Sequence, residues 1–429
     1  MAKMNNDLQP SAAIITCDVL VIGGGAAGVA AATAAGRVGA RVVLLERYGF
    51  LGGLATSAQV GNACGFYLRD TINEKPVLVA EGFVREYASK LQRAAGREPM
   101  RLDAGLWVLP YPILMFGNVA NAILKESGDI TVVLHATVAG AQTDGSHVVQ
   151  VQALAWNEPI IVRPATVVDG SGDATISGLA GATVNNAVAD QAPALVFSLE
   201  QVETGLMEYG LIEVRREVRR GVEKGLLPTV CERLALIPGS NCNGRMDIKL
   251  NLSPEFSDKP LWQQMTCWER DTRALVEDLH RFLVQNTTIC RNARLASVAP
   301  QLGLRSGMRI QGRASLEDED VLNARKHAFG VARGSWPMER WGKGVRPEIA
   351  LFSERDYYEI PLDCLRPPKL DNVFAAGRCF SAAMGAMTSG RVIGTALATG
   401  WAAGTAAAFQ ALGQPLDEAI NTVRRQMNQ

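Results

Sequence analysis

The stretch from Asp18 to Thr56, DVLVIGGGAAGVAAATAAGRVGARVVLLERYGFLGGLAT, constrains the fold more than any other part of the chain. The apolar run Val19–Ile22 predicts a buried strand, and three glycines follow it directly. An alanine-rich segment from about Ala26 predicts a helix, and Val42–Leu45 predicts a second strand. Strand, glycine turn, helix and strand in this order are typical of a βαβ unit that binds a dinucleotide.

The glycines and the acid of this unit have separate tasks. Gly23 and Gly25 let the backbone turn and approach a pyrophosphate, and Gly28 lets the helix pack closely against the first strand. The positive end of the helix then faces the phosphates. Glu46 follows Gly28 by about 20 residues, the place of the acid that hydrogen-bonds a ribose hydroxyl and repels a 2′-phosphate. The unit therefore favours FAD or NAD over NADP; the alternative is a glycine-rich turn in an ordinary α/β protein.

Charge and composition exclude several classes of partner. Of 429 residues, 48% are hydrophobic and 20% charged, which is typical of a soluble globular protein. Lysine plus arginine equals aspartate plus glutamate, at 43 each, so no global field attracts nucleic acid or an anionic membrane. We expect a small-molecule partner instead. The sequence leaves the oligomeric state open, including a homo-oligomer.

The N-terminal segment and the cysteines indicate the compartment, and one long apolar segment raises the question of a membrane span. Residues 1–16 contain no signal-peptide pattern, which predicts a cytoplasmic protein. The eight cysteines form no CxxC and there are four histidines, so we expect reduced thiols and no metal site. The segment Val392–Leu412 is long enough to span a bilayer, but its alanine, glycine and threonine side chains gain little in lipid. It therefore predicts a helix buried in the core.

The segment after the βαβ unit predicts a return to the main sheet. A loop is expected at Ser57–Leu68, and helices at Pro76–Ala95 and from Pro112 to Lys125. Three apolar runs then predict a small antiparallel meander, with a turn at Asp144-Gly145. These runs are Ile130–Val138, Val148–Trp156 and Ile160–Val168.

The middle of the chain has a different pattern. Strands are expected at Ala192–Gln201 and Met246–Leu252, and helices at Glu203–Lys224 and Pro260–Gln285. We interpret residues 185–348 as an inserted α+β domain that faces the substrate. Residues 1–184 and 349–429 then form one discontinuous nucleotide-binding domain.

The C-terminal part supplies a second contact for a long cofactor. An apolar strand at Asn372–Ala376 runs into Gly377 and Arg378, and a loop of small residues leads to Arg391 and the final helix. A helix that begins near Arg391 directs its positive end, with the arginine charge, at its ligand.

Four blocks carry a resemblance to a known family. They are DVLVIGGGAAG with ERYGFLGGLAT, VVDGSGDATISGLAGA, LGLRSGMRIQGRASLEDEDV, and the segment from Ile360 to Ala408. The chain resembles the FAD-dependent oxidoreductases of the glutathione-reductase-type flavoprotein fold, in the subgroup related to fumarate reductase flavoproteins. The expected fold is α/β: a Rossmann-like FAD-binding domain with a parallel sheet and a small antiparallel meander, plus the inserted α+β substrate domain.

The resemblance implies a set of cofactor-binding residues. It assigns the pyrophosphate to the glycine turn, the ribose to Glu46, adenine to Val138, and the ribityl chain and ring to the C-terminal segment. The implied FAD-binding residues are Gly23, Gly25, Ala27, Gly28, Glu46, Arg47, Gly52, Gly53, Leu54, Ala55, Thr56, Val138, Asp169, Gly170, Ser171, Gly377, Arg378, Arg391 and Val392.

The catalytic residues are less well defined, because the chain departs from the family pattern. Met384 stands where relatives commonly have a histidine, and Ser306 and Met308 stand where they tend to have glutamate and arginine. No histidine base can be carried over. The catalytic candidates are Arg391, Arg378, Arg305 and Tyr67.

Three functions are compatible with these residues. The first is an enzyme that transfers a hydride between a small organic substrate and N5 of the flavin. The second is a flavin-dependent monooxygenase, and the third is a non-enzymatic electron-transfer subunit. Since no second GxGxxG motif follows, the substrate or a partner protein is expected to supply electrons, and oxygen or a protein to accept them.

Overall fold

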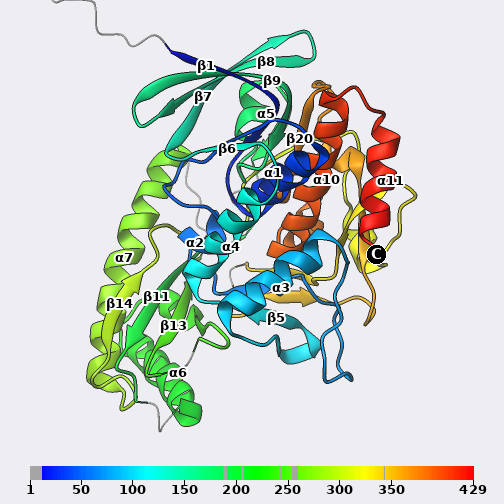
Figure 1. The fold of residues 1–429 in the computed structure, drawn as a ribbon. Coiled ribbons are helices and arrows are strands. Elements are labelled where there is room, and N and C mark those ends of the chain that lie inside the picture. Colours follow the sequence, from blue (N-terminus) through cyan, green and yellow to red (C-terminus); the bar gives the residue numbers. More distant parts are fainter. Residues whose placement is uncertain (1–11, 187–190, 204–206, 241–242, 254–258, 343) are drawn as a thin grey trace, which may run out of the picture.

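The parallel strands of the main sheet run in the same direction, so their carboxyl ends lie together on one side of the fold (Figure 1). The computed structural model describes residues 12–429 except 187–190, 204–206, 241–242, 254–258 and 343. Its largest sheet has the order β6-β2-β1-β9-β8-β7, and β20 also pairs with β9. Strands β6, β2, β1, β9 and β20 are parallel, whereas β7, β8 and β9 form an antiparallel meander. The predicted parallel sheet with its meander is confirmed. The strands are β1 Ala13–Ile22, β2 Val42–Leu45, β6 Ile130–Val133, β7 Ala136–Asp144, β8 His147–Ala155, β9 Glu158–Asp169 and β20 Val373–Ala375.

Strand β1 is longer than its apolar run because both halves find a partner. Its second half pairs with β2 on one side, where Val19 lies opposite Val42. Its first half pairs with β9 alone, from Ala13 opposite Ile160 to Cys17 opposite Pro164. The first half is therefore partly exposed, while the second is buried almost throughout. The sequence pattern showed the buried half only.

Two helices in backbone contact lie against the parallel strands. Helix α1 (Ala26–Val38) packs beside α10 (Ile393–Ala411), as Figure 1 shows near the centre of the fold. A Cβ atom on Gly400 or Gly404 would lie 2.1 Å from the carbonyl oxygen of Ala27 or Ala31. Because alanines and glycines form the contact, the helices approach closely and α10 is almost entirely buried, as predicted.

The lengths of the helices bear on whether the chain can span a bilayer. Among those in the described residues, no single helix has the length and apolarity needed to cross a membrane. Helix α9 (Met384–Gly390) and α10 have the required length and apolarity only when they are taken together, and a bend of 92° separates them.

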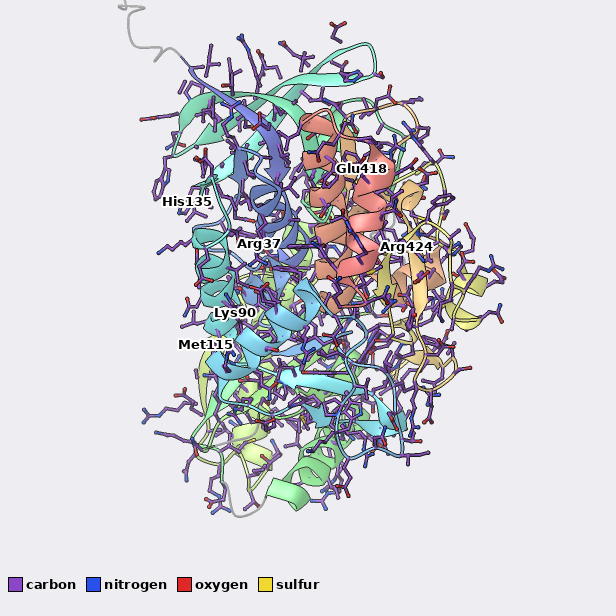
Figure 2. All side chains as sticks on the ribbon, turned by 45° about the vertical axis from the view of Figure 1, so that its right-hand side comes forward. Arg37, Lys90, Met115, His135, Glu418 and Arg424 are labelled. Carbon is purple, nitrogen blue, oxygen red and sulfur yellow. The ribbon has the colours of Figure 1, made fainter. Side chains whose placement is uncertain are left out.

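An outer layer of helices is linked to α1 by an ion pair, and a second ion pair links two of its helices to each other. It contains α3 (Phe83–Ala95), α4 (Ile113–Lys125) and α11 (Leu416–Gln426). Arg37 of α1 bonds to Glu86 of α3 at 2.7 Å, and Lys90 reaches Glu126 after α4 at 2.7 Å. Arg37 and Lys90 lie on one side of the molecule (Figure 2). Partly exposed pairs of this kind add little stability, at most about 1 kcal/mol each.

A second sheet has a hydrophobic core of its own. Four antiparallel strands have the order β12-β13-β11-β14, and α6 (Met207–Glu223) and the long α7 (Leu261–Asn286) accompany them (Figure 1). The core includes Phe197, Ile248 and Leu279. Domain boundaries after residues 184 and 348 stay a prediction. The strands are β11 Ala194–Glu200, β12 Leu234–Leu236, β13 Met246–Asn251 and β14 Arg294–Val298.

Several short elements complete the fold around these two sheets. They are α2 Leu54–Ser57, β3 Asn62–Cys64, β4 Met100–Arg101, β5 Trp107–Pro110, α5 Thr175–Leu179, β10 Val184–Asn186, β15 Met308–Ile310, α8 Asp318–Leu322, β16 Gly330–Gly334, β17 Met338–Arg340, β18 Glu348–Ala350 and β19 Tyr358–Pro361.

Some local predictions are wrong. The run Ile130–Val138 is divided between β6 and β7, because His135 adopts a φ of 54° and the chain changes partner strand there. Helix α3 begins at Phe83 rather than Pro76, after Gly82 with a φ of 63°. The expected loop before Arg391 contains helix α9, and the expected loop at Ser57–Leu68 contains β3.

A cavity at the carboxyl edge of the main sheet

A cavity lies where the parallel strands end. Its wall includes Ile22 from β1, Glu46 after β2, Gly170 after β9 and Ala376 after β20. Ligands of open α/β sheets bind in this crevice, outside the carboxyl ends of the strands.

Three glycine loops in backbone contact line the cavity. Gly23 has a φ of 93°, and a Cβ there would lie 2.7 Å from the carbonyl oxygen of Gly170. The amide of Gly52 donates to the carbonyl of Gly24 at 2.8 Å, and a Cβ on Gly53 would lie 2.9 Å from the Cα of Gly25. Side chains would fill this space, so glycine leaves a cradle of bare backbone that a pyrophosphate can approach.

Helix α1 begins at the cradle with unsatisfied donors. Gly25 is its N-cap and supplies no side-chain cap, and the first turn contains no acidic residue. Ala26 and Ala27 of that turn line the cavity. The free amide groups and the positive end of the helix therefore favour an anion there.

Glu46, which follows β2, is hydrogen-bonded to the glycine cradle. Its Oε2 accepts from the Gly24 amide at 2.5 Å and its Oε1 from the Tyr48 amide at 2.8 Å. The residue is 3% exposed, and burial raises its pKa while these two hydrogen bonds oppose the change. Each carboxylate oxygen has two lone pairs, so both can still accept from a ribose hydroxyl.

Two arginines of the C-terminal segment make part of the cavity wall cationic, and we call this part the cationic end. Gly377, Arg378, Arg391 and Ile393 line it. Arg391 occupies the bend between α9 and α10, and Val392 is the N-cap of α10 without a side-chain cap. Arg378 is held by the carbonyl of Gly172 at 2.9 Å and by Asp173 at 3.2 Å.

Within the part of the chain that the structure describes, Arg391 keeps most of its hydrogen-bonding capacity. A hydrogen bond to the Gln191 side chain holds it, and burial lowers its pKa while the charge of Glu339 opposes this change. An arginine remains protonated at neutral pH even so.

Most of the predicted cofactor residues meet in this cavity. Those in its wall are Gly23, Gly25, Ala27, Glu46, Arg47, Gly52, Gly53, Leu54, Ala55, Val138, Gly170, Ser171, Gly377, Arg378 and Arg391. Their individual roles toward a cofactor stay predictions.

Four predicted residues do not line the cavity. A Cβ on Gly28 would lie 1.7 Å from the Gly23 carbonyl oxygen, so Gly28 serves helix packing. Thr56 donates to the carbonyl of Leu51 at 3.0 Å. The buried Asp169 accepts from the Ser171 and Ser177 hydroxyls at 2.6 and 2.8 Å and shapes the turn after β9. Val392 is the helix cap described above.

Two catalytic candidates also lie outside the wall. Tyr67 is 6% exposed and packs in the main core, where burial raises the pKa of its hydroxyl. Arg305 bonds to the carbonyl of Ala192 and to Asn251 in the neighbouring part of the fold. The structure therefore brings Arg378 and Arg391, but not Tyr67 or Arg305, to the cavity.

Two polar residues of the cavity wall were not predicted from the sequence. The hydroxyl of Tyr48 donates to the amide oxygen of Gln301, and both residues line the cavity. They are separated by 253 positions. Tyr48 follows Glu46 closely and could have been included on that ground, whereas no local pattern marks Gln301.

A sequence model of the family described as FAD dependent oxidoreductase matches residues 18–424. The chain belongs to this family. It is therefore an FAD-dependent oxidoreductase, and the glycine cradle and the free end of α1 fit FAD.

Similarity to individual proteins is more restricted. Sarcosine oxidase subunit alpha of Rhizobium meliloti (strain 1021) is 48% identical over 61 residues, which cover 14% of this chain and 6% of that protein. A geranylgeranyl bacteriochlorophyll reductase-like protein of Thermoplasma acidophilum has a TM-score of 0.47 at 13% identity, over 96% of this chain and 83% of its own. The anhydrotetracycline hydroxylase of Streptomyces rimosus has a TM-score of 0.49 at 15% identity, over 96% and 65%.

Proposed function

We propose that this flavoenzyme is of the dehydrogenase or oxidase type and oxidises a small organic substrate. Bound FAD supplies a ring that accepts a hydride at N5. The observation that carries the proposal is the pairing of Arg391 with the uncapped start of α10 at one end of the cavity. The glycine cradle offers bare backbone whereas Arg391 offers charge, so the two halves of an elongated cofactor would have distinct partners.

The cradle is our proposed site for the nucleotide half of FAD. The start of α1 would hold the pyrophosphate, and Glu46 would accept hydrogen bonds from the ribose. Val138, at the end of the cavity formed by β7, would contact adenine. The assignment accounts for a buried carboxylate whose lone pairs the backbone only partly occupies.

The cationic end is our proposed site for the flavin ring. A guanidinium and the positive end of a helix both stabilise negative charge, and a ring that takes up a hydride develops such charge near N1 and C2. Arg391 would act on this charge directly because its hydrogen bond to Gln191 uses only part of its donor set. The segment 185–348, which supplies Gln301, would form the substrate side.

The test is an anaerobic titration of the purified holoenzyme with small organic substrates. We expect a true substrate alone to bleach the absorbance of the oxidised flavin, and admission of oxygen or of a protein acceptor to restore it. Bleaching by NAD(P)H only, with substrate-stimulated oxygen uptake and oxygen in the product, would replace the proposal with a monooxygenase. A flavin that no substrate reduces, in a stable complex with a redox protein, would replace it with an electron-transfer subunit.

A further inference from the structure

A group of charged and aromatic side chains extends from Arg391 away from the cofactor cavity. We call Lys249, Arg305, Glu339, Trp341 and Arg391 the anion pocket. The Nζ atom of Lys249 lies 4.9 Å from the centre of the Trp341 ring, and the Cζ atom of Arg305 lies 4.7 Å from it. The indole of Trp341 donates to Glu339 at 2.7 Å. Residues from β13, β17 and two loops thus meet around one ring.

A single amide connects this group to the cofactor cavity. With the Gln191 amide turned so that both of its ends find partners, its oxygen accepts from Nε of Arg391 at 3.2 Å. Its nitrogen then donates to the backbone carbonyl of Glu339, also at 3.2 Å. Gln191 is 2% exposed, so this bridge is buried. Arg391 therefore belongs both to the wall of the cavity and to the anion pocket.

The anion pocket has an excess of positive charge. Its three cations face one carboxylate, and both oxygens of Glu339 already accept from indoles, those of Trp336 and Trp341. The cations are close enough to affect one another: Arg305 lowers the pKa of Lys249, and Arg391 lowers that of Arg305, in each case after burial as the larger cause. The nearby thiol of Cys64 adds no charge, since burial raises its pKa to about 12.

Lys249 lacks an acceptor for its ammonium group. Within the described part of the chain it contacts the Trp341 ring, and no hydrogen bond or ion pair is formed by its nitrogen. Burial, followed by Arg305, lowers its pKa to about 8, and Glu339 only partly opposes this effect. An apolar side chain could cover Trp341 without the cost of a half-buried charge, so the ammonium needs another explanation.

We propose that Lys249 and Arg391 together bind the carboxylate of the substrate, so that the enzyme oxidises a small organic acid. Arg305, 4.7 Å from the centre of the Trp341 ring, adds a further positive charge to the group. A guanidinium can hold a carboxylate through two parallel hydrogen bonds, and an ammonium supplies a point charge from another direction. The inference rests on the proposed function, because it places the bound acid beside the proposed flavin end.

The test is a binding titration of the holoenzyme that requires no turnover. The probes are acetate, benzoate and succinate, each paired with its neutral amide, and the measurement is the change in the visible absorbance of bound FAD. We expect saturable changes with the carboxylates and none with the amides. Affinity should fall as the pH rises through about 8, because Lys249 then loses its proton while Arg305 and Arg391 keep theirs.

Variants at Lys249 separate binding from folding. Lys249→Met should weaken carboxylate binding at least tenfold and abolish the decline above pH 8. Lys249→Arg should retain binding without that decline. The control is Lys224→Met, which removes an exposed lysine and should match the wild type. FAD content and melting temperature are measured first, and only variants that retain both are compared.

Different results would overturn the two proposals. Equal binding of amides and acids, no saturable change with any acid, or wild-type affinity and pH dependence in Lys249→Met would refute the anion pocket. Flavin reduction by a neutral substrate in the same preparation would then leave the proposed function standing. If carboxylates bind through Lys249 and yet no organic substrate ever reduces the flavin, the anion pocket stands and the hydride-transfer proposal fails.

Discussion

Replacing Gly28 by alanine tests the packing on which the cofactor site rests. The new methyl carbon would lie 1.7 Å from the carbonyl oxygen of Gly23 and 2.9 Å from its carbonyl carbon. Both atoms are backbone, so no side chain can rotate away. Helix α1 would have to move by more than an ångström, and its contact with Gly400 and Gly404 of α10 restricts that movement.

The expected loss of stability follows from this geometry. Overpacking of a core typically costs about 1–3 kcal/mol, and a clash between backbone atoms belongs at or above the upper end, at about 3–5 kcal/mol. The better helix propensity of alanine offsets about 1 kcal/mol. An unfolding entropy of about 2.1 cal/mol/K per residue corresponds to roughly 0.9 kcal/mol/K for this chain, so the melting temperature should fall by about 2–4 °C.

The assay compares Gly28→Ala with a matched variant in another helix. A Cβ on Gly178 of α5 would meet only Val184, at 3.8 Å, which is an ordinary contact. Gly178→Ala should therefore melt at or slightly above the wild-type temperature. Melting is followed by circular dichroism, and bound FAD is quantified by absorbance after its release from a known amount of protein.

The clash in Gly28→Ala also displaces the carbonyl of Gly23, so the cradle should lose FAD affinity as well as stability. A Gly28→Ala protein that has the same melting temperature as Gly178→Ala and carries a full complement of FAD would refute this reasoning. It would show that α1 is not held where the contacts with Gly23 and α10 place it.

The remaining predictions concern charged groups. Glu46→Arg removes the acceptor of two backbone amides and puts a cation in the cavity wall, so FAD binding should weaken at least tenfold; a purified variant with full yellow colour would contradict this. Arg391→Ala should lower the midpoint potential of the flavin by about 30–60 mV, measured by redox titration, and an unchanged potential would remove the role assigned to its charge. Hydrogen bonds from Asn73 and the ion pair with Arg355 lower the pKa of Asp70, so its contribution to stability is present above its unfolded pKa of 3.8 and is lost as the pH falls below it. Asp70→Asn should flatten the acid limb of the melting-temperature curve, and an acid limb as steep as that of the wild type would exclude this carboxylate as its source.

The features that sequence alone predicted are local or lie at fixed spacing. The βαβ unit was predictable because a buried strand, a glycine turn and an acid at the end of the next strand lie within Asp18–Thr56. The buried helix α10 was predictable because its alanines and glycines suit a protein core better than lipid. A strand, a glycine and a helix start in the C-terminal part predicted a second contact with the cofactor, and the structure places Gly377 and Arg391 in the cavity wall.

Other features depend on contacts between distant parts of the chain. Exchange of strand partners at His135 ended the strand predicted through Val138, although the apolar run continues. Lys249 looks like an ordinary lysine of an alternating strand in the sequence. Its proposed role depends on its contact with Trp341, with which it shares no local sequence pattern. It also depends on Gln191, which links the anion pocket to Arg391. Sequence periodicity reports which side of an element is buried, whereas the charge that a buried side chain meets is decided by tertiary packing.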